Sequence, residues 1–218
     1  GHGQFWTVFQ EMPVLAPVSN NAVVGITIDG VDKVYSFTGI DDTKQWDGIH
    51  LRAFTYNTNS QVWATLPDVP DTQGKIGVAA SPVDTMIYIM GGYHVNSNGT
   101  EVTSAKVHRF DAKNDVFIAD GQDIPVPTDD HVQAVWKDSL IFLVTGWSNS
   151  GNIPEVQIYN PYTDSWQMGT SVPNNQNYKS FGASGTIIGD TLFYFGGANS
   201  DSFTFAAQKY LRKGFINP

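Results

Sequence analysis

One pattern recurs four times along the chain: a run of apolar or aromatic residues that ends at a glycine. The four runs end at Gly39, Gly92, Gly146 and Gly197, which are 53, 54 and 51 residues apart. Such a run is typical of a buried strand that ends in a sharp turn, because glycine adopts backbone angles that other residues avoid. A period near 50 residues indicates a fold built from one repeated unit.

A second pattern alternates with the first, in which two aromatic residues stand seven positions apart. It occurs as YNTNSQVW (56–63), FDAKNDVF (110–117) and YNPYTDSW (159–166). An Asn or Asp follows each first aromatic residue, and its side chain can bond the backbone two residues on and set a tight turn. Each phrase therefore predicts two strands joined by a turn.

Each unit opens with a short strand rich in small residues. These strands are predicted at 23–28, 76–81, 132–136 and 181–188. Small side chains suit a strand that packs near a crowded axis. The complete unit has four strands, a to d: strand b ends at the glycine, strand c ends at the aromatic-Asx pair, and strand d carries the second aromatic residue. Because their position recurs in the repeat, we expect Trp63, Phe117, Trp166 and Trp6 to pack in the cores between units.

A four-stranded unit with this period is typical of a β-propeller blade, so the predicted fold class is all-β. The sequence resembles the kelch repeat in Gly91-Gly92, Gly196-Gly197, the aromatic-Asx phrases, Trp63 and Trp166. In the other two units a Thr replaces the first glycine, and the Arg that often precedes strand a in kelch proteins is missing. The resemblance covers essentially the whole chain and implies a kelch-type β-propeller of about four blades.

The whole chain, 1–218, is predicted to be a single propeller domain. Its predicted parts are a strand d in 1–17, blades at 18–70, 71–127 and 128–174, and an incomplete last blade at 175–218. Two arrangements fit this count. Either the N-terminal strand closes a four-bladed ring, or the chain is part of a larger ring of about six to seven blades. Missing blades or a second copy in a homo-oligomer would complete the larger ring.

Composition excludes several classes of function. Hydrophobic residues make up 41% and charged residues 15%, which is typical of a folded protein. The net charge is −9 and the 12 Lys and Arg are scattered, so we expect no nucleic-acid partner. No apolar run approaches the roughly 20 residues that span a bilayer, so we expect no membrane insertion. The absence of Cys fits either an exported bacterial protein or a cytosolic one. Of these we expect a bacterial, extracytoplasmic protein, either periplasmic or secreted.

In a propeller the d–a and b–c loops share one face around the central channel, and ligands of kelch-like proteins tend to bind there. The predicted b–c loops place aromatic side chains beside polar ones. The candidate ligand-binding residues are Trp46, Tyr93, Trp147, His94, Asn149 and Asp42. An aromatic ring can pack on the apolar face of a sugar while amides and carboxylates bond its hydroxyls. We therefore expect a carbohydrate or protein ligand; ordinary packing between blades is the alternative role of the aromatic rings.

Two further functions stay open. His131, Asp130 and Asp129 precede a strand a and could transfer protons at the channel mouth, as the resemblance to kelch-like sialic-acid mutarotases implies. The chain would then be a sugar mutarotase or isomerase. The other alternative is a pure protein-interaction scaffold. We prefer a binding protein without catalysis.

We expect no metal and no cofactor. No His pair has the spacing of a metal site. The adjacent acids Asp41-Asp42 and Asp129-Asp130 leave Ca²⁺ as the alternative. The copper chemistry of the kelch-like galactose oxidase needs a Tyr–Cys crosslink, which a chain without Cys cannot form.

Overall fold

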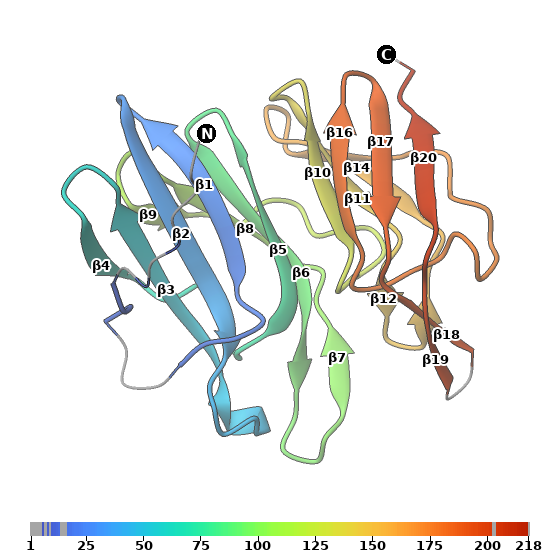
Figure 1. The fold of residues 1–218 in the computed structure, drawn as a ribbon, viewed down its shortest axis with the longest axis horizontal. Coiled ribbons are helices and arrows are strands. Elements are labelled where there is room, and N and C mark those ends of the chain that lie inside the picture. Colours follow the sequence, from blue (N-terminus) through green and yellow to red (C-terminus); the bar gives the residue numbers. More distant parts are fainter. Residues whose placement is uncertain (1–5, 7, 9, 14–16, 202–203, 218) are drawn as a thin grey trace.

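The structure, a computed structural model, describes residues 6, 8, 10–13, 17–201 and 204–217. Within these ranges the chain forms antiparallel strands and one short 3-10 turn, η1 (Trp46–Gly48) (Figure 1). None of the described residues belongs to a helix long and apolar enough to cross a membrane. The all-β prediction is confirmed.

The first two sheets each contain one complete four-stranded unit. Sheet 1 is β1 (Ala22–Ile28), β2 (Val31–Ile40), β3 (Ile49–Asn57) and β4 (Val62–Leu66), in that order. Sheet 2 is β5 (Ile76–Val83), β6 (Met86–Val95), β8 (Val107–Asp111) and β9 (Val116–Ile118). Neighbours in the sequence are therefore neighbours in each sheet, as the repeat predicts.

The same order continues in the second half of the chain. Sheet 3 is β10 (Val132–Trp136), β11 (Leu140–Val144), β14 (Val156–Asn160) and β15 (Ser165–Met168). Sheet 4 is β16 (Ser184–Ile188), β17 (Thr191–Phe195) and β20 (Leu211–Phe215). Sheet 4 thus has three strands among the described residues. The strand predicted in 1–17 falls mostly outside the described residues, and those of its positions that are described form no strand.

Short hairpins extend the b–c loops at one end of the molecule, the lower end in Figure 1. They are β7 (Glu101–Thr103) paired with the end of β6, β12 (Trp147–Ser148) with β13 (Gly151–Asn152), and β18 (Ala198–Asp201) with β19 (Thr204–Ala207). The η1 turn lies at the same end. These extensions place the predicted ligand-binding loops on one face.

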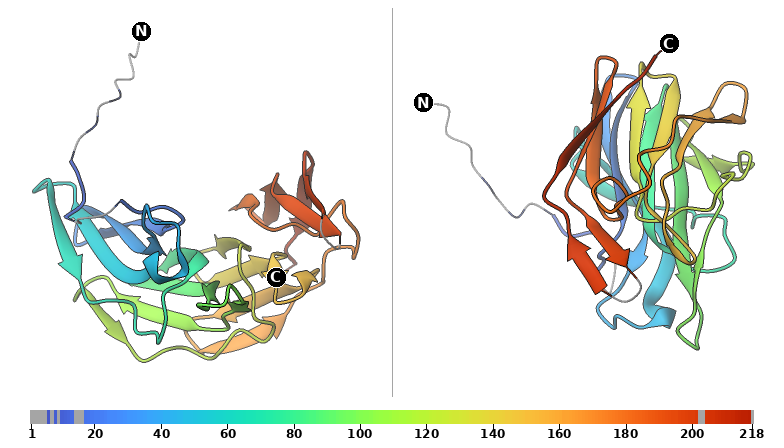
Figure 2. Two further views of the ribbon diagram at one scale, coloured as in Figure 1. Left: turned by 90° about the horizontal axis from the view of Figure 1, so that it is seen from below. Right: turned by 90° about the vertical axis from the view of Figure 1, so that its right-hand side faces the viewer.

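The four sheets follow one another around an arc (Figure 2, left). Their first strands contact in series, β1 with β5, β5 with β10, and β10 with β16. Sheets 1 and 4 remain far apart at the two ends of the arc. The described residues alone therefore do not form the closed four-bladed ring that was one of the two predicted arrangements.

The apolar run before Gly91-Gly92 is explained by burial on both faces of sheet 2. Ile87 and Ile89 point toward sheet 1, while Tyr88 and Met90 point toward sheet 3. All four side chains are at most 5% exposed. A strand covered on both faces needs apolar residues at every position instead of every second one.

The glycines predicted to end the b strands allow a close contact with the next sheet, although β6 itself continues past Gly92 to Val95. The amides of Gly39, Gly92 and Gly146 donate to the carbonyls of Lys75, Thr128 and Ser180, over 3.4, 3.2 and 2.8 Å. All three glycines have positive φ. At Gly146 a Cβ would lie 2.7 Å from the carbonyl oxygen of Asp129. Each of sheets 1 to 3 is therefore anchored to the linker that enters the next sheet.

The seven-residue phrases form direct cross-strand pairs. The ring centroids lie 5.2, 4.9 and 5.0 Å apart in the pairs Tyr56–Trp63, Phe110–Phe117 and Tyr159–Trp166. Phe117 and Trp166 pack against the cores between sheets, as predicted. Trp6 was expected to do the same, and this prediction is wrong, because its side chain is 93% exposed and pairs with no described strand.

Sheet 4 exposes a face that the other sheets bury. Phe195 occupies the strand-b position of Phe37, Met90 and Val144, which are at most 2% exposed because a following sheet covers them. Phe195 is 55% exposed. Its neighbour across the ladder, Leu211, is also exposed. Sheet 4 is thus packed on one side only among the described residues.

Candidate functional site

The linkers into the four sheets share one backbone feature. Each contains a residue in the left-handed region shortly before or at the start of the first strand, namely Asn20, Gly77, Asp130 and Gly182. Asp130 donates its amide to the carbonyl of Gly77 over 2.9 Å, and Gly182 donates to the carbonyl of Asp130 over 2.7 Å. The junctions of sheets 2, 3 and 4 are therefore linked in series along the inner side of the arc.

A hollow of about 290 Å³ lies over these junctions. Its polar and aromatic lining comes from Asn20, Asn21, Tyr93, Asp130 and His131. Three of these residues, Tyr93, Asp130 and His131, were predicted as site residues from the sequence. The hollow lies where the d–a junctions of the four sheets meet, which is the predicted ligand face.

Gly77 gives the hollow its shape. A Cβ at Gly77 would lie 3.1 Å from the ring of Tyr93 and 3.2 Å from the carboxyl carbon of Asp130. The ring and the carboxyl group therefore flank the same small space. Burial raises the pKa of Tyr93 to about 12, and the nearby acids Asp130, Glu101 and Asp129 add to this effect.

Asp129 lies beneath the hollow and is nearly inaccessible, with 3% exposure. Thr103 donates its hydroxyl to Oδ2 of Asp129 over 2.6 Å. Burial raises the pKa of Asp129 to about 7, since it outweighs the hydrogen bond from Thr103, and Asp130 and Glu101 raise it further. Near neutral pH this buried carboxyl group therefore exchanges between its protonated and ionised forms.

Asp130 differs from Asp129 because it lines the hollow itself. Burial, followed by repulsion from Glu101, raises the pKa of its carboxyl group. Among the described residues no side chain or amide donates a hydrogen bond to this carboxyl group. Its oxygens are therefore available to a ligand.

His131 has a defined tautomer. Gln133 donates its amide nitrogen to Oγ of Ser81 over 2.9 Å, which leaves its Oε1 as the acceptor for Nε2–H of His131 at 3.0 Å. Burial lowers the pKa of His131 to about 4, so the ring is neutral at pH 7. The ring also contacts the backbone of Thr128, which opposes the effect of burial on this pKa, and Nδ1 is closed off from solvent.

Asn149 reaches the same cluster from the b–c hairpin of sheet 3. Its amide donates to Oγ1 of Thr103 over 2.9 Å, and its side-chain oxygen accepts from the amide of Thr103 at 3.0 Å. Trp147 pairs with Asp129 through backbone hydrogen bonds of 2.9 Å in both directions. Thr103, which the sequence did not single out, joins the two hairpins to Asp129.

The remaining predicted ligand-binding residues lie outside the lining of the hollow. The ring of Trp147 packs edge-on against Phe181, with 5.6 Å between centroids. Nδ1 of His94 lies 3.0 Å from the carbonyl of Gly74. Trp46 is 46% exposed and Asp42 is exposed, both in the loop between β2 and β3. Their proposed roles in ligand binding stay predictions.

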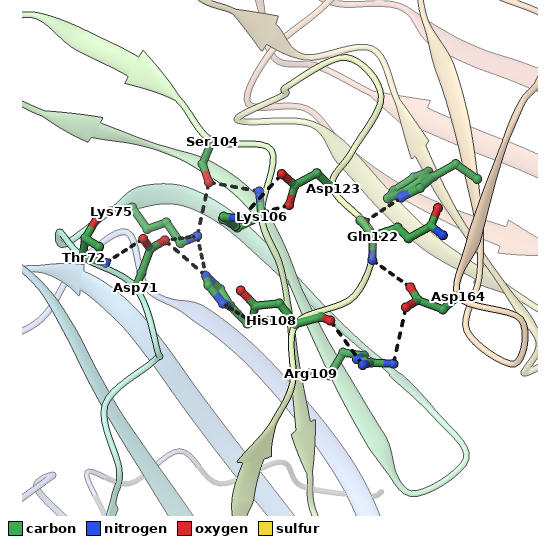
Figure 3. Close-up of polar contacts among 12 residues, drawn as sticks. Asp71, Thr72, Lys75, Ser104, Lys106, His108, Arg109, Gln122, Asp123 and Asp164 are labelled. Carbon is green, nitrogen blue, oxygen red and sulfur yellow. Dashed lines mark hydrogen bonds and ion pairs between the residues drawn. The ribbon is translucent and has the colours of Figure 1, made fainter.

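A second polar cluster lies in the linker that enters sheet 2 (Figure 3). The ammonium group of Lys75, which is fully buried, lies 2.9 Å from Asp71, 2.8 Å from Nε2 of His108 and 3.4 Å from the hydroxyl of Ser104. Its three hydrogens thus have three acceptors. Nδ1 of His108 lies 2.9 Å from Asp120.

The repeat shows that this second cluster is structural. His108, Gln157 and Arg212 occupy the same position on strand c of sheets 2, 3 and 4, and each is at most 5% exposed. Gln157 donates to the hydroxyl of Thr128 over 3.1 Å, and Arg212 donates to the carbonyl of Asn177 over 2.6 Å. In all three sheets, a buried polar side chain of strand c holds the incoming linker.

Ionisation of Asp71 is coupled to this cluster. Burial alone would raise the pKa of Asp71, but its contacts with His108 and Lys75 outweigh that effect and hold the pKa well below its ordinary value. Burial lowers the pKa of Lys75 against the attraction of Asp71. Across the described residues, no group of three or more His, Asp or Glu side chains is arranged to hold a metal ion.

Comparison with known proteins supports the repeat and the fold. The chain is 26% identical over 170 residues to Kelch-like protein terF of Aspergillus terreus, covering 74% of this chain and 34% of that protein. It is 27% identical over 168 residues to Kelch-like protein 25 of Xenopus tropicalis, covering 77% and 25%. The chain therefore spans between a quarter and about a third of the length of these relatives. No protein-family model matches the sequence.

A solved structure, "Structure of YjhT", superimposes on 97% of this chain and 68% of its own chain, with a TM-score of 0.69 and 17% identity. The fold is that of a kelch-type β-propeller. The resemblance to kelch-repeat proteins and the predicted fold class are both confirmed at this level. At 17% identity the solved structure supports the fold and carries no residue roles to this kelch-type chain.

Proposed function

We propose that this kelch-type propeller binds a carbohydrate in the hollow at the d–a junctions. The observation that supports the proposal is the lining, where the ring of Tyr93 stands beside the amides of Asn20 and Asn21 and the carboxyl group of Asp130. A sugar offers an apolar ring face to an aromatic side chain and hydroxyls to amides and carboxylates. The volume of about 290 Å³ suits a ligand of monosaccharide size.

Calorimetric titration with a panel of neutral, basic and acidic monosaccharides tests this proposal. We expect saturable binding of at least one sugar, and a loss of about tenfold or more in Tyr93→Ala, because a sugar loses its packing surface. Tyr162→Ala is the control, since Tyr162 is 66% exposed and lies outside the hollow. A flat response across the panel would reject carbohydrate binding here and favour a protein ligand on the b–c hairpins.

A second candidate function is acid–base catalysis on the bound sugar. It is supported by the raised pKa of Asp129, about 7, because a group that titrates near neutral pH can accept and return a proton. However, Asp129 is 3% exposed and does not line the hollow. We therefore favour binding without turnover. Anomerisation measured by NMR that is lost in Asp129→Asn, while affinity is retained, would reverse this preference.

A further inference from the structure

The hollow offers hydrogen-bond acceptors that no described donor satisfies. The carboxyl group of Asp130 receives no hydrogen bond from the described residues. Buried acceptors are costly when they stay unpaired. A ligand that brings several donors would satisfy them.

The charge of the hollow is entirely negative. Asp130 lines it, and Asp129 and Glu101 are close enough to shift the pKa of Tyr93. No Lys or Arg is part of the lining, and His131 is neutral at pH 7. An acidic sugar would therefore meet repulsion, whereas a cation would be attracted.

The ring of Tyr93 adds a second attraction for a cation. It stands on the same small space over Gly77 as the carboxyl group of Asp130. The face of an aromatic ring attracts an ammonium group, and a carboxylate within hydrogen-bond distance forms a charge-assisted bond with it. The aromatic ring of Tyr93 and the carboxylate of Asp130 therefore both favour a ligand with a positively charged nitrogen.

We propose that the ligand is an amino sugar whose protonated primary amine is bound by Asp130 and the ring of Tyr93. This inference rests on the proposed carbohydrate-binding function and specifies its ligand. The ammonium group supplies hydrogen-bond donors to the two carboxyl oxygens of Asp130. The side-chain amide of Asn20 is then available to the hydroxyls of the sugar, whereas Nδ2 of Asn21 already donates to Oγ of Ser36 over 2.7 Å.

The test compares four sugars of one size by calorimetry: D-glucosamine, D-glucose, N-acetyl-D-glucosamine and D-glucuronate. The titrations are run at about pH 6.5, below the ordinary pKa of an amine of this class. We expect D-glucosamine to bind about tenfold more tightly than the two neutral sugars, and D-glucuronate to bind most weakly.

Asp130→Asn isolates the charge, because it keeps the shape of the side chain and because Asn20 shows that Asn fits the same left-handed position in the repeat. We expect this variant to lower the affinity for D-glucosamine about tenfold and to leave that for D-glucose unchanged. Asp138→Asn is the control, since Asp138 carries the same backbone conformation in the hairpin between β10 and β11, outside the hollow.

Four outcomes separate the inference from the function on which it rests. Equal affinities for D-glucosamine and D-glucose would overturn the inference and leave carbohydrate binding in place. Tighter binding of D-glucuronate, or an equal loss of both affinities in Asp130→Asn, would overturn it in the same way. If none of the four sugars binds, both the inference and the carbohydrate site in the hollow are rejected.

Discussion

The linkers into sheets 2 and 3 occupy the same place in the repeat, but the buried charges are paired in the first linker and lack a counter-ion in the second. In the linker into sheet 2, Lys75 is paired with Asp71 and its ammonium hydrogens are all satisfied by close acceptors. In the linker into sheet 3, Asp129 and Asp130 stand together without a cation. The ion pair of Lys75 with Asp71 fixes the linker into sheet 2. The negative charge of Asp129 and Asp130 is left without a counter-ion, and a cationic ligand can supply one.

Comparing equivalent positions in the repeat separates buried polar residues that hold the fold from those that bind a ligand. A polar residue at His108, Gln157 or Arg212 is explained by its partner in the incoming linker. The acids that precede β10 face no cation among the described residues, and burial together with nearby acids raises their pKa values, although Asp129 accepts a hydrogen bond from Thr103. The unpaired acids are therefore the better guide to a binding site.

The largest loss of stability is expected when the buried ion pair of Lys75 with Asp71 is removed. Lys75→Met removes the buried ammonium group and leaves Asp71 and His108 without their partner. We expect a loss of about 3–5 kcal/mol in the free energy of unfolding, measured by urea titration. Lys106→Met is the control, because its ion pair with Asp123 is about half exposed, and we expect a change of less than about 1 kcal/mol. Similar losses in both variants would show that the buried cluster does not stabilise the linker.

The raised pKa of Asp129, in the linker into sheet 3, should make the free energy of unfolding depend on pH. The pKa of Asp129 is raised to about 7 in the folded protein, so between about pH 4 and pH 7 the unfolded chain has lost a proton that the folded one keeps. The free energy of unfolding then falls as pH rises through this window. We expect Asp129→Asn, compared with Asp123→Asn, to remove a decline of about 1–3 kcal/mol between pH 5 and pH 8 in urea titrations.

The sign is opposite for Asp71, whose pKa is lowered by folding. Its contribution to stability is present above about pH 4 and is lost as pH falls below that value. The stabilising contribution of Asp71, in the linker into sheet 2, is therefore lost as pH falls. That of Asp129, in the linker into sheet 3, is lost as pH rises. A parent protein whose stability does not decline between pH 5 and pH 8 would contradict the raised pKa of Asp129, even if its acid unfolding agreed with the lowered pKa of Asp71.

The smallest effect is expected at Trp46, which the sequence suggested as a sugar platform. The role stays a prediction, but Trp46 lies in the loop between β2 and β3, outside the lining of the hollow. We expect Trp46→Ala to change sugar affinity by less than about twofold, whereas Tyr93→Ala reduces it about tenfold in the same calorimetric titration. The reverse order would move the binding site to the loops of sheet 1.

Local sequence patterns predicted most of the fold. The glycines located the ends of β2, β11 and β17 to within two residues, whereas β6 continues past Gly92 to Val95. The seven-residue phrases predicted pairs such as Tyr159–Trp166, because a strand pair joined by a tight turn is set by nearby residues. The strand predicted at 132–136 coincides with β10. The exposure of Trp6 was missed because it depends on whether a distant sheet covers it.

The site was predictable only in part. The junction residues Asp129, Asp130 and His131 were found because they precede a strand a, and the structure places them at or beneath the hollow. Thr103 and Gly77 were missed, since their roles depend on contacts with other sheets. The pairing of Lys75 with His108 spans 33 residues and no local pattern reports it. Comparing the left-handed position of each linker, Asn20, Gly77, Asp130 and Gly182, would have located the hollow.

The exposed face of sheet 4 has a consequence for how the molecule opens. Sheets 2 and 3 are packed on both sides, whereas among the described residues sheet 4 packs only against sheet 3. In a serial array each member depends on its neighbours, so partial unfolding starts where one neighbour is absent. Backbone amides of β17 and β20 should therefore exchange with solvent through local opening, while those of β6 and β11 exchange only when the array as a whole comes apart.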